Sequence, residues 1–217
     1  MVLAALAPQS RATTFFNGDF EAPGGGGTVY LNSGDGTQDR VNGWLHGGGY
    51  SNSEFYTGTG VWGISANDGN SYVGFGASGG LGGTLSQTFD TIVGQTYLVR
   101  YFLATQEFNG IPPTQVATVA ALDAINGNAL LAYVVNSFNT EAGKWFAGLE
   151  LIFTANSSST TLRFIEQSTE AQEPPPSLAN GVNWALDSVS VEAVPEPGTI
   201  GLVGLGLAAL GFIRRCR

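Results

Sequence analysis

Short segments in which apolar and polar side chains alternate, separated by Gly, Asn and Pro, recur along most of the chain and constrain its fold. In QTYLVRYFLAT (95–105), Tyr97, Val99, Tyr101 and Leu103 fall on one face of an extended segment, and that face is fully apolar. Helical periodicity is hard to find, so the pattern predicts an all-β protein. The candidate strands are Thr14–Phe20, Ser71–Phe75, Thr84–Phe89, Gln95–Thr105, Gln115–Leu122, Ala129–Asn136, Trp145–Ala155, Thr160–Gln167 and Trp184–Glu192.

Turn signals between these segments refine the prediction. Asn126-Gly127 separates two strand-like runs and predicts a hairpin, because both residues tolerate positive φ. Residues 22–70, rich in Gly, Asn and Ser, predict one long loop region with short strands. The segment 74–79 matches GxGxxG, but the residues after it alternate like a strand, so we interpret it as a strand end and turn.

Length and composition favour one folded domain with appendages. The 217 residues include 24 aromatic side chains, 13 Phe, 7 Tyr and 4 Trp, which are enough to fill a core. The formal net charge of −9 makes nucleic acid an improbable partner, because an acidic surface repels phosphates. The single cysteine, Cys216, lies in the C-terminal tail, so the body is expected to contain no disulfide and no thiolate metal site.

The C-terminus differs from the rest of the chain. Val194-Pro195-Glu196-Pro197 precedes fifteen uncharged residues, 199–213, and Arg214, Arg215 and Arg217 follow at once. With Gly198 the apolar run would make about 24 Å of helix, short of the ~30 Å hydrocarbon core of a membrane. The arginines would hold that end in the cytoplasm. The alternative is a buried C-terminal helix of the domain.

These three ordered features resemble the PEP-CTERM sorting signal of Gram-negative bacteria. The resemblance implies that residues 194–217 are an address: an exosortase-like membrane protease recognises Pro-Glu-Pro, cuts near it and releases the protein to the cell surface or extracellular matrix. It implies an inner-membrane intermediate held through 198–213, and a mature chain without the residues beyond about Pro197.

The N-terminus, MVLAALAPQSRA (1–12), has small apolar residues but no basic region and only a short apolar core. We expect it to be the remnant of an export signal that begins upstream, or otherwise a disordered cytosolic end. The domain is then expected to span residues 13–193.

The body resembles the galactose-binding-like jelly roll, a β-sandwich family that includes many non-catalytic carbohydrate-binding modules. The segments that carry this resemblance are 17–21 (NGDFE), Phe89 with 94–97 (GQTY), Trp145 with 153–155 (FTA), 161–164 (TLRF) and 186–191 (LDSVSV). The resemblance predicts a jelly-roll β-sandwich followed by a C-terminal hydrophobic sorting helix.

Many such modules hold a structural calcium ion where their first and last strands meet. By this resemblance Glu21 and Asp187 stand at the ligand positions, and Asp19 is a weaker candidate. Calcium prefers several oxygen ligands. The alternative is that Asp187 caps a turn and that Glu21 is solvated.

Aromatic residues in the loop region are candidates for a sugar site. Flat rings stack on sugar faces, while neighbouring amides and carboxylates bond hydroxyl groups. The predicted carbohydrate-binding residues are Trp44, Tyr50, Tyr56 and Trp62, with Phe55 beside them. The alternative is that Trp44 and Trp62 cover one end of the sandwich, while Trp145 and Trp184, within strand patterns, are expected in the core.

Few residues suggest catalysis. His46 is the only histidine, no GxSxG motif accompanies it, and a surface loop is its expected place. The acidic residues leave a glycosidase pair open but favour none. We therefore expect a non-enzymatic, exported polysaccharide-binding protein. A structural matrix protein without a specific ligand is the first alternative, and a glycan-active enzyme is the second.

Overall fold

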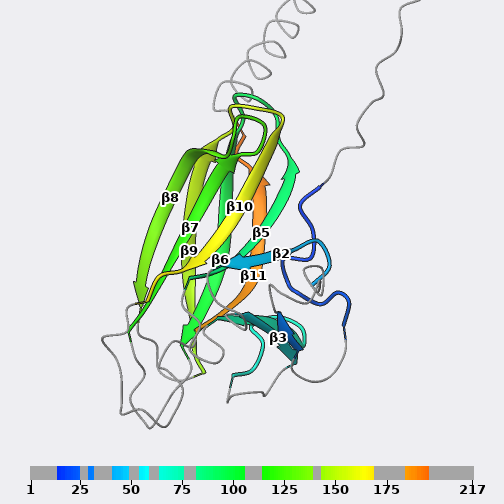
Figure 1. Ribbon diagram of the computed structural model, residues 1–217, viewed down its shortest axis with the longest axis vertical. Helices are drawn as coiled ribbons and strands as arrows, with labels where there is room; N and C mark the ends of the chain where they lie inside the picture. The colour runs from blue at the N-terminus through cyan, green and yellow to red at the C-terminus, as the bar shows by residue number, and fades with distance from the viewer. Residues whose placement is uncertain are drawn as a thin grey trace, which may run out of the picture.

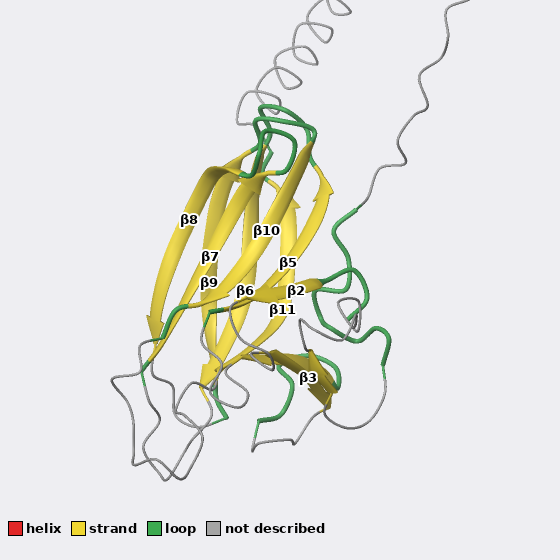
Figure 2. Ribbon diagram, in the orientation of Figure 1, coloured by secondary structure: helices red, strands yellow, loops and turns green. Residues whose placement is uncertain are grey.

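The computed structural model describes residues 14–24, 29–31, 41–48, 54–58, 64–75, 82–105, 114–138, 143–168 and 184–195 (Figure 1). These residues form eleven strands in two sheets, and no helix occurs among them (Figure 2). The strands are β1 (Val29–Leu31), β2 (Leu45–Gly48), β3 (Glu54–Gly58), β4 (Ser71–Phe75), β5 (Gly83–Asp90), β6 (Thr96–Thr105), β7 (Gln115–Asp123), β8 (Ala129–Phe138), β9 (Trp145–Thr154), β10 (Ser159–Glu166) and β11 (Trp184–Ala193).

The two sheets are antiparallel and pack face to face. One has the order β1-β3-β4-β11-β6-β9, and the other has the order β2-β5-β10-β7-β8. The non-consecutive neighbours mean that the chain crosses repeatedly between the sheets, as in a jelly-roll sandwich. The predicted all-β jelly-roll fold is confirmed.

Eight of the nine predicted strands are present, with ends shifted by no more than two residues. The strand predicted at Thr14–Phe20 is wrong, because Asn17 and Phe20 have φ of 53° and 57°, outside the extended region. The Gln87 side chain takes the place of a neighbouring strand: its amide accepts from Phe16 N and donates to Phe16 O, at 2.9 Å each.

The core lies between the sheets and contains the inward face of each strand. On β6 the predicted apolar face is confirmed, since Tyr97, Val99, Tyr101 and Leu103 are all buried. Trp184 is also in the core, stacked on Phe75 with ring centroids 3.8 Å apart. At about 25 cal/mol per Å² of apolar surface, this layer supplies most of the driving force for folding.

The predicted hairpin joins β7 to β8 and is confirmed. Its positive φ values fall on Gly127 (70°) and Asn128 (60°), one residue later than we expected from Asn126-Gly127. Asp123 explains the shift: its carboxylate accepts from the backbone N–H groups of Ile125 and Asn126 and from the Asn126 side chain. These bonds close the first part of the turn in the right-handed region.

The long region 22–70 contains β1, β2 and β3, each of five residues or fewer, as predicted. The sorting helix predicted at 198–213 lies outside the described residues, as do the N-terminal segment 1–12 and residues 76–79 of the GxGxxG match. In the part of the chain that the structure describes, no helix is long and apolar enough to cross a membrane.

Candidate functional site

Trp44 does not form part of a surface sugar site. Its side chain is 1 % exposed, and its ring contacts Phe15, Phe20 and Phe164 at centroid distances of 5.7, 5.3 and 6.1 Å. Its indole N–H donates to Asn17 O at 2.8 Å. The prediction for Trp44 is wrong because it occupies an inward position just before β2.

The expectation for His46 is also wrong, because successive residues of a strand point to opposite faces of the sheet. Leu45 points outward and is half exposed, whereas His46, the next residue of β2, is buried rather than on a surface loop. Of the other predicted sugar-binding residues, Tyr50 and Trp62 lie outside the described residues. Tyr56 is part of β3, where only its backbone is described.

Two of the three predicted calcium ligands meet at one turn, residues 67–71. The Asp187 carboxylate, fully buried, accepts from the N–H groups of Asn67 and Asp68 at 2.7 and 3.2 Å. The Glu21 carboxylate accepts from the N–H groups of Asn70 and Ser71 at 2.6 and 2.7 Å. The first and last segments of the domain are thus joined through the 67–71 turn.

Gly69 is required for this arrangement. It has a φ of 63°, and a Cβ at this position would lie 2.5 Å from the Glu21 carboxyl carbon. The turn therefore approaches Glu21 more closely than any residue with a side chain could.

The electrostatics of the turn are dominated by burial of a carboxyl group. Burial, and to a smaller extent the neighbouring negative charge of Asp68, raise the pKa of Asp187 to about 7, against the lowering effect of the three N–H donors. The sequence-based prediction missed Asp68. Asp19 is exposed and makes no hydrogen bond or ion pair within the described residues.

Calcium remains a prediction at this turn. The oxygen chemistry of Glu21, Asp68 and Asp187 suits a hard cation, and burial raises the pKa of Asp187. Searched over the described residues alone, however, no group of three or more His, Cys, Asp or Glu side chains is close enough together to hold a metal ion. Backbone carbonyls would have to complete the coordination.

The outer face of the five-stranded sheet carries a second candidate site. In the ladder of β8, β7, β10, β5 and β2, the residues Tyr133, Ala120, Arg163, Ser86 and Leu45 are paired in one row across the sheet. Adjacent strands lie about 4.8 Å apart, so Tyr133 and Arg163 stand roughly 10 Å apart on either side of Ala120. The small alanine leaves a depression between the two large side chains.

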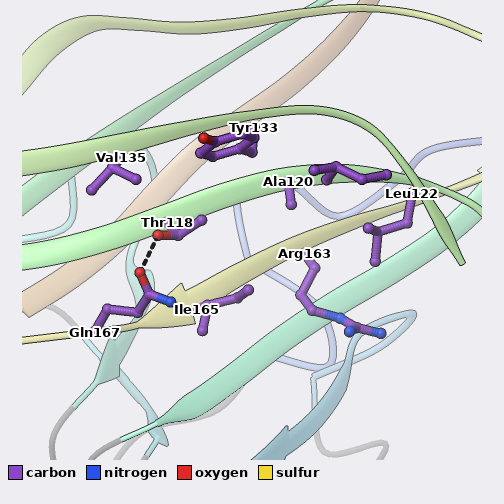
Figure 3. A pocket seen from close by; sticks show the side chains of 9 residues that line it. Thr118, Ala120, Leu122, Tyr133, Val135, Arg163, Ile165 and Gln167 are labelled. Carbon is purple, nitrogen blue, oxygen red and sulfur yellow. Dashed lines mark hydrogen bonds between the residues drawn. The ribbon is translucent and has the colours of Figure 1, made fainter.

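This depression has a volume of about 300 Å³ and continues along the strands (Figure 3). Tyr133 is 60 % exposed, and Val135 and Leu130 beside it on β8 are more than half exposed. Gln167 lies at the end of the depression beyond β10, where its amide oxygen accepts from the Thr118 hydroxyl at 2.5 Å. We call this surface, lined by Thr118, Ala120, Leu122, Leu130, Tyr133, Val135, Arg163, Ile165 and Gln167, the β8 groove.

The chemistry of the β8 groove combines one flat ring with polar groups at a fixed spacing. The Arg163 side chain is partly buried and makes no hydrogen bond or ion pair to another described residue, so its five N–H donors can serve a ligand. The Gln167 amide N–H₂ adds donors, and Tyr133 offers a ring face and a hydroxyl. A ligand with an apolar face and a rim of oxygens matches this set.

Sequence reasoning missed the β8 groove because it looked for aromatic residues in loops. The signal was present in two strands: ALLAYVV places Tyr133 opposite the apolar face of β8, and TLRFI places Arg163 opposite Leu162 and Phe164. The pairing of both with Ala120 depends on strand order, which a single sequence does not contain.

The buried carboxylates Asp123 and Glu166 are not a close pair. Asp123 pairs with Thr160 at one end of β10, and Glu166 lies at the other end of β10, six residues beyond Thr160. The two carboxylates are therefore roughly 20 Å apart. Glycosidase pairs are about 5–9.5 Å apart. Asp123 binds the hairpin turn and Ser157, bonds that lower its pKa to about 2, and burial raises the pKa of Glu166, which accepts from Ser168 N and Gly82 N.

Several solved structures have a fold similar to that of this chain. The structure is similar to that of TmCBM61 in complex with β-1,4-galactotriose, with a TM-score of 0.52 and 13 % identity over 85 % of this chain and 100 % of that one. It is also similar to arabinose-bound MgGH51 α-L-arabinofuranosidase, with a TM-score of 0.50 and 15 % identity over 84 % of this chain and 26 % of that one. A CBM4 structure matches with a TM-score of 0.46 and 12 % identity, over 82 % of this chain and 99 % of that one. At these identities the likeness concerns the fold.

No curated protein sequence matches the chain. The family model for the PEP-CTERM protein-sorting motif matches residues 193–217. The chain therefore ends in a PEP-CTERM motif, which indicates export and a sorting route to the cell surface, behind a jelly-roll domain of the kind found in carbohydrate-binding modules.

Proposed function

We propose that the protein is sorted to the surface or extracellular matrix of a bacterium, where it binds polysaccharide through the β8 groove without cleaving it. The observation that carries this proposal is the row of Tyr133, Ala120 and Arg163 across three paired strands. The similarity in fold to a galactotriose-bound module is consistent with it.

Binding in the β8 groove would combine stacking with hydrogen bonds. A sugar ring on Tyr133 would cover apolar surface on β8, and its hydroxyl or carboxylate oxygens would reach the donors of Arg163 and Gln167. Strands carry Tyr133 and Arg163, and Gln167 directly follows β10, so little ordering would be required on binding. A chain of sugars could lie across the strands, because the depression is open at the surface.

The test is binding of β-1,4-galactan and of the producing bacterium's own exopolysaccharide. Tyr133→Ala and Arg163→Gln should each weaken binding about tenfold or more, through loss of stacking and of charge-assisted hydrogen bonds respectively. The matched controls are Ile152→Ala and Arg100→Gln on the outer face of the other sheet, with Ile152 59 % exposed and Arg100 ion-paired to Glu150 and Glu192. Because all four side chains are at the surface, the unfolding midpoint should change little.

Three outcomes would contradict the proposal. Equal binding by Tyr133→Ala, Arg163→Gln and the wild type would move the ligand away from the β8 groove. No binding by the wild type would favour a structural matrix protein without a specific ligand, and release of sugars from the polysaccharide would favour an enzyme.

Sorting requires a second partner, an exosortase-like membrane protease that cuts near Pro195-Glu196-Pro197. The last strand, β11, ends at Ala193, so the proposed cut follows it by about four residues in the sequence. Protein purified from the cell surface should lack the residues beyond about Pro197, as measured by intact mass. Surface material that retains Arg217 would contradict the proposed cut.

We also propose a calcium ion at the 67–71 turn, bound by Glu21 and Asp187 with Asp68 beside them. Support comes from the raised pKa of Asp187 and from the arrival of the first and last segments of the domain at one turn. Bound calcium would stabilise this junction, and a chelator would reveal it through the pH dependence of unfolding.

A further inference from the structure

One end of the sandwich, where the described chain stops, exposes three branched apolar side chains. We call it the exit end: the turns 91–95, 124–128 and 155–158, together with Val194 and Pro195. Ile92, Val93 and Ile125 are 70 %, 64 % and 59 % exposed, and the first two have the largest exposed fractions among the large hydrophobic residues described. Figure 1 shows β11 ending at the same end as these turns.

The exit end is held together by hydrogen bonds that fix these side chains in place. Thr91 N donates to Ser158 O at 3.0 Å, Ala124 N donates to Ser159 O at 3.1 Å, and the Ser157 hydroxyl donates to the Asp123 carboxylate at 2.7 Å. The apolar side chains thus extend from ordered turns. Burying them in the sandwich would require breaking these bonds, so they can leave water only by contact with another surface.

The chain leaves the sandwich beside the 91–95 turn. Val194 N donates to Thr96 O, and the Gln95 side chain donates to Val194 O at 2.7 Å. From Pro195 to Thr199, the first residue of the uncharged run, an extended chain spans no more than about 14 Å. Any membrane that holds residues 199–213 therefore lies close to the exit end.

Charge also suits a lipid surface. The chain as a whole carries a net charge of −9. Among the described residues of the exit end, counting the last residue of each strand that meets it, only Asp90 and Asp123 are charged, and Asp123 is 2 % exposed. The remaining exposed side chains are neutral amides and hydroxyls such as Asn126, Asn128, Asn156 and Ser158. A neutral polar end with apolar tips is compatible with phospholipid headgroups, from which the acidic remainder of the surface would be repelled.

We infer that the exit end is a membrane-facing surface. While the sorting segment is inserted, Ile92, Val93 and Ile125 enter the headgroup and acyl boundary and orient the domain with its long axis away from the bilayer. This inference rests on the proposed membrane intermediate and not on the polysaccharide site. Cutting near Pro197 removes the tether, and the contact of three side chains is too small to keep the domain on the membrane, so release follows.

The test uses the full chain with Cys216→Ser, reconstituted in vesicles of phosphatidylethanolamine with a minor fraction of phosphatidylglycerol. A single environment-sensitive fluorophore is attached through Val93→Cys or Phe146→Cys. Phe146 is 48 % exposed and pairs with Leu103, seven residues along β6 from Thr96 and thus roughly 23 Å from the exit end. A quencher carried on the lipid headgroups should quench the label at position 93 several-fold more strongly than the label at position 146.

A second arm removes the apolar tips. With the label at Asn126→Cys, the triple variant Ile92→Ser, Val93→Ser and Ile125→Ser should reduce quenching to the level at position 146, whereas Phe146→Ser should leave it unchanged. In addition, the triple substitution should weaken binding of the domain cut at Pro197 to these vesicles by at least about tenfold. Polysaccharide binding should be retained in every variant.

Vesicle flotation separates the possible failures. If the full chain does not float with the vesicles, both the membrane intermediate and this inference are wrong. If it floats but both labels are quenched equally, or if the triple variant changes nothing, only the inference is wrong. Quenching of the label at position 93 that depends on protein concentration and not on lipid quencher would point to a second copy of the chain. Loss of polysaccharide binding with intact quenching would overturn the β8 groove alone.

Discussion

Trp44→Ala is expected to lower the free energy of unfolding by about 3–5 kcal/mol, the usual cost of removing a large buried aromatic side chain. The ring lies at the contact of three phenylalanine rings, and its N–H satisfies the backbone oxygen of Asn17. The alanine variant would leave a large cavity and would remove one of the two hydrogen bonds to the Asn17 carbonyl oxygen, the other being donated by Phe20 N. Thermal unfolding should show a fall of roughly 10 °C or more in the midpoint.

The adjacent residue provides the control. Leu45→Ala removes a side chain that is half exposed on the outer face of β2, so it should change the free energy of unfolding by less than about 1 kcal/mol. Trp44→Phe retains part of the ring packing and should still bind polysaccharide when folded. Lost binding in a well-folded Trp44→Phe, or equal destabilisation by Trp44→Ala and Leu45→Ala, would contradict the core position of Trp44.

In the presence of a chelator, stability should fall as the pH rises from about 4 to about 7. The Asp187 carboxyl has a pKa of about 7 when folded, against about 3.9 when unfolded. Between these values the folded state keeps a proton that the unfolded state has released, so raising the pH favours unfolding. A difference of about three units corresponds to a loss on the order of 4 kcal/mol across this range.

Asp187→Asn isolates this effect because it cannot titrate. Its unfolding free energy should decline less steeply over the same range, while Glu166, whose pKa burial also raises, contributes equally to both proteins. Calcium should flatten the decline in the wild type, since a bound cation favours the ionised carboxylate. An equal decline in both proteins would contradict the assignment to Asp187, and a wild type unaffected by calcium or chelator would remove the proposed ion.

The sequence predicted the strands well where one face of each strand is buried. The alternation in β6 specifies both its extent and its inward face, and eight strands were found in this way. Trp184 was also correctly expected in the core, while Trp145 is only partly buried and donates its indole N–H to Ser65 O at the edge of the sandwich.

The failures have a common physical cause. Thr14–Phe20 has the composition of a strand, but its backbone is set by a distant partner, the side chain of Gln87. Trp44 stands in a Gly-rich segment, yet long-range packing buries it. The β8 groove depends on the lateral order β8-β7-β10, so residues far apart in sequence become neighbours only after the sheet is formed.

The sites were predictable to different degrees. The resemblance placed Glu21 and Asp187 at one site, and both carboxylates accept hydrogen bonds from one turn. Asp68 was not expected there, because its position depends on hydrogen bonds between the 67–71 turn and β11, which are far apart in the sequence. Tyr133 and Arg163 each occupy an outward strand position, which the alternation indicated, but nothing local marks them as partners.

The hydrogen bonds of Gln95 to the end of β11 have a consequence for maturation. The Gln95 side chain donates to Val194 O, and Val194 N donates to Thr96 O. These hydrogen bonds hold the last residue before the Pro-Glu-Pro element to the sandwich. Proteolysis beyond Pro195 would remove none of these bonds. We therefore expect the domain to keep these closing hydrogen bonds both before and after removal of its tail.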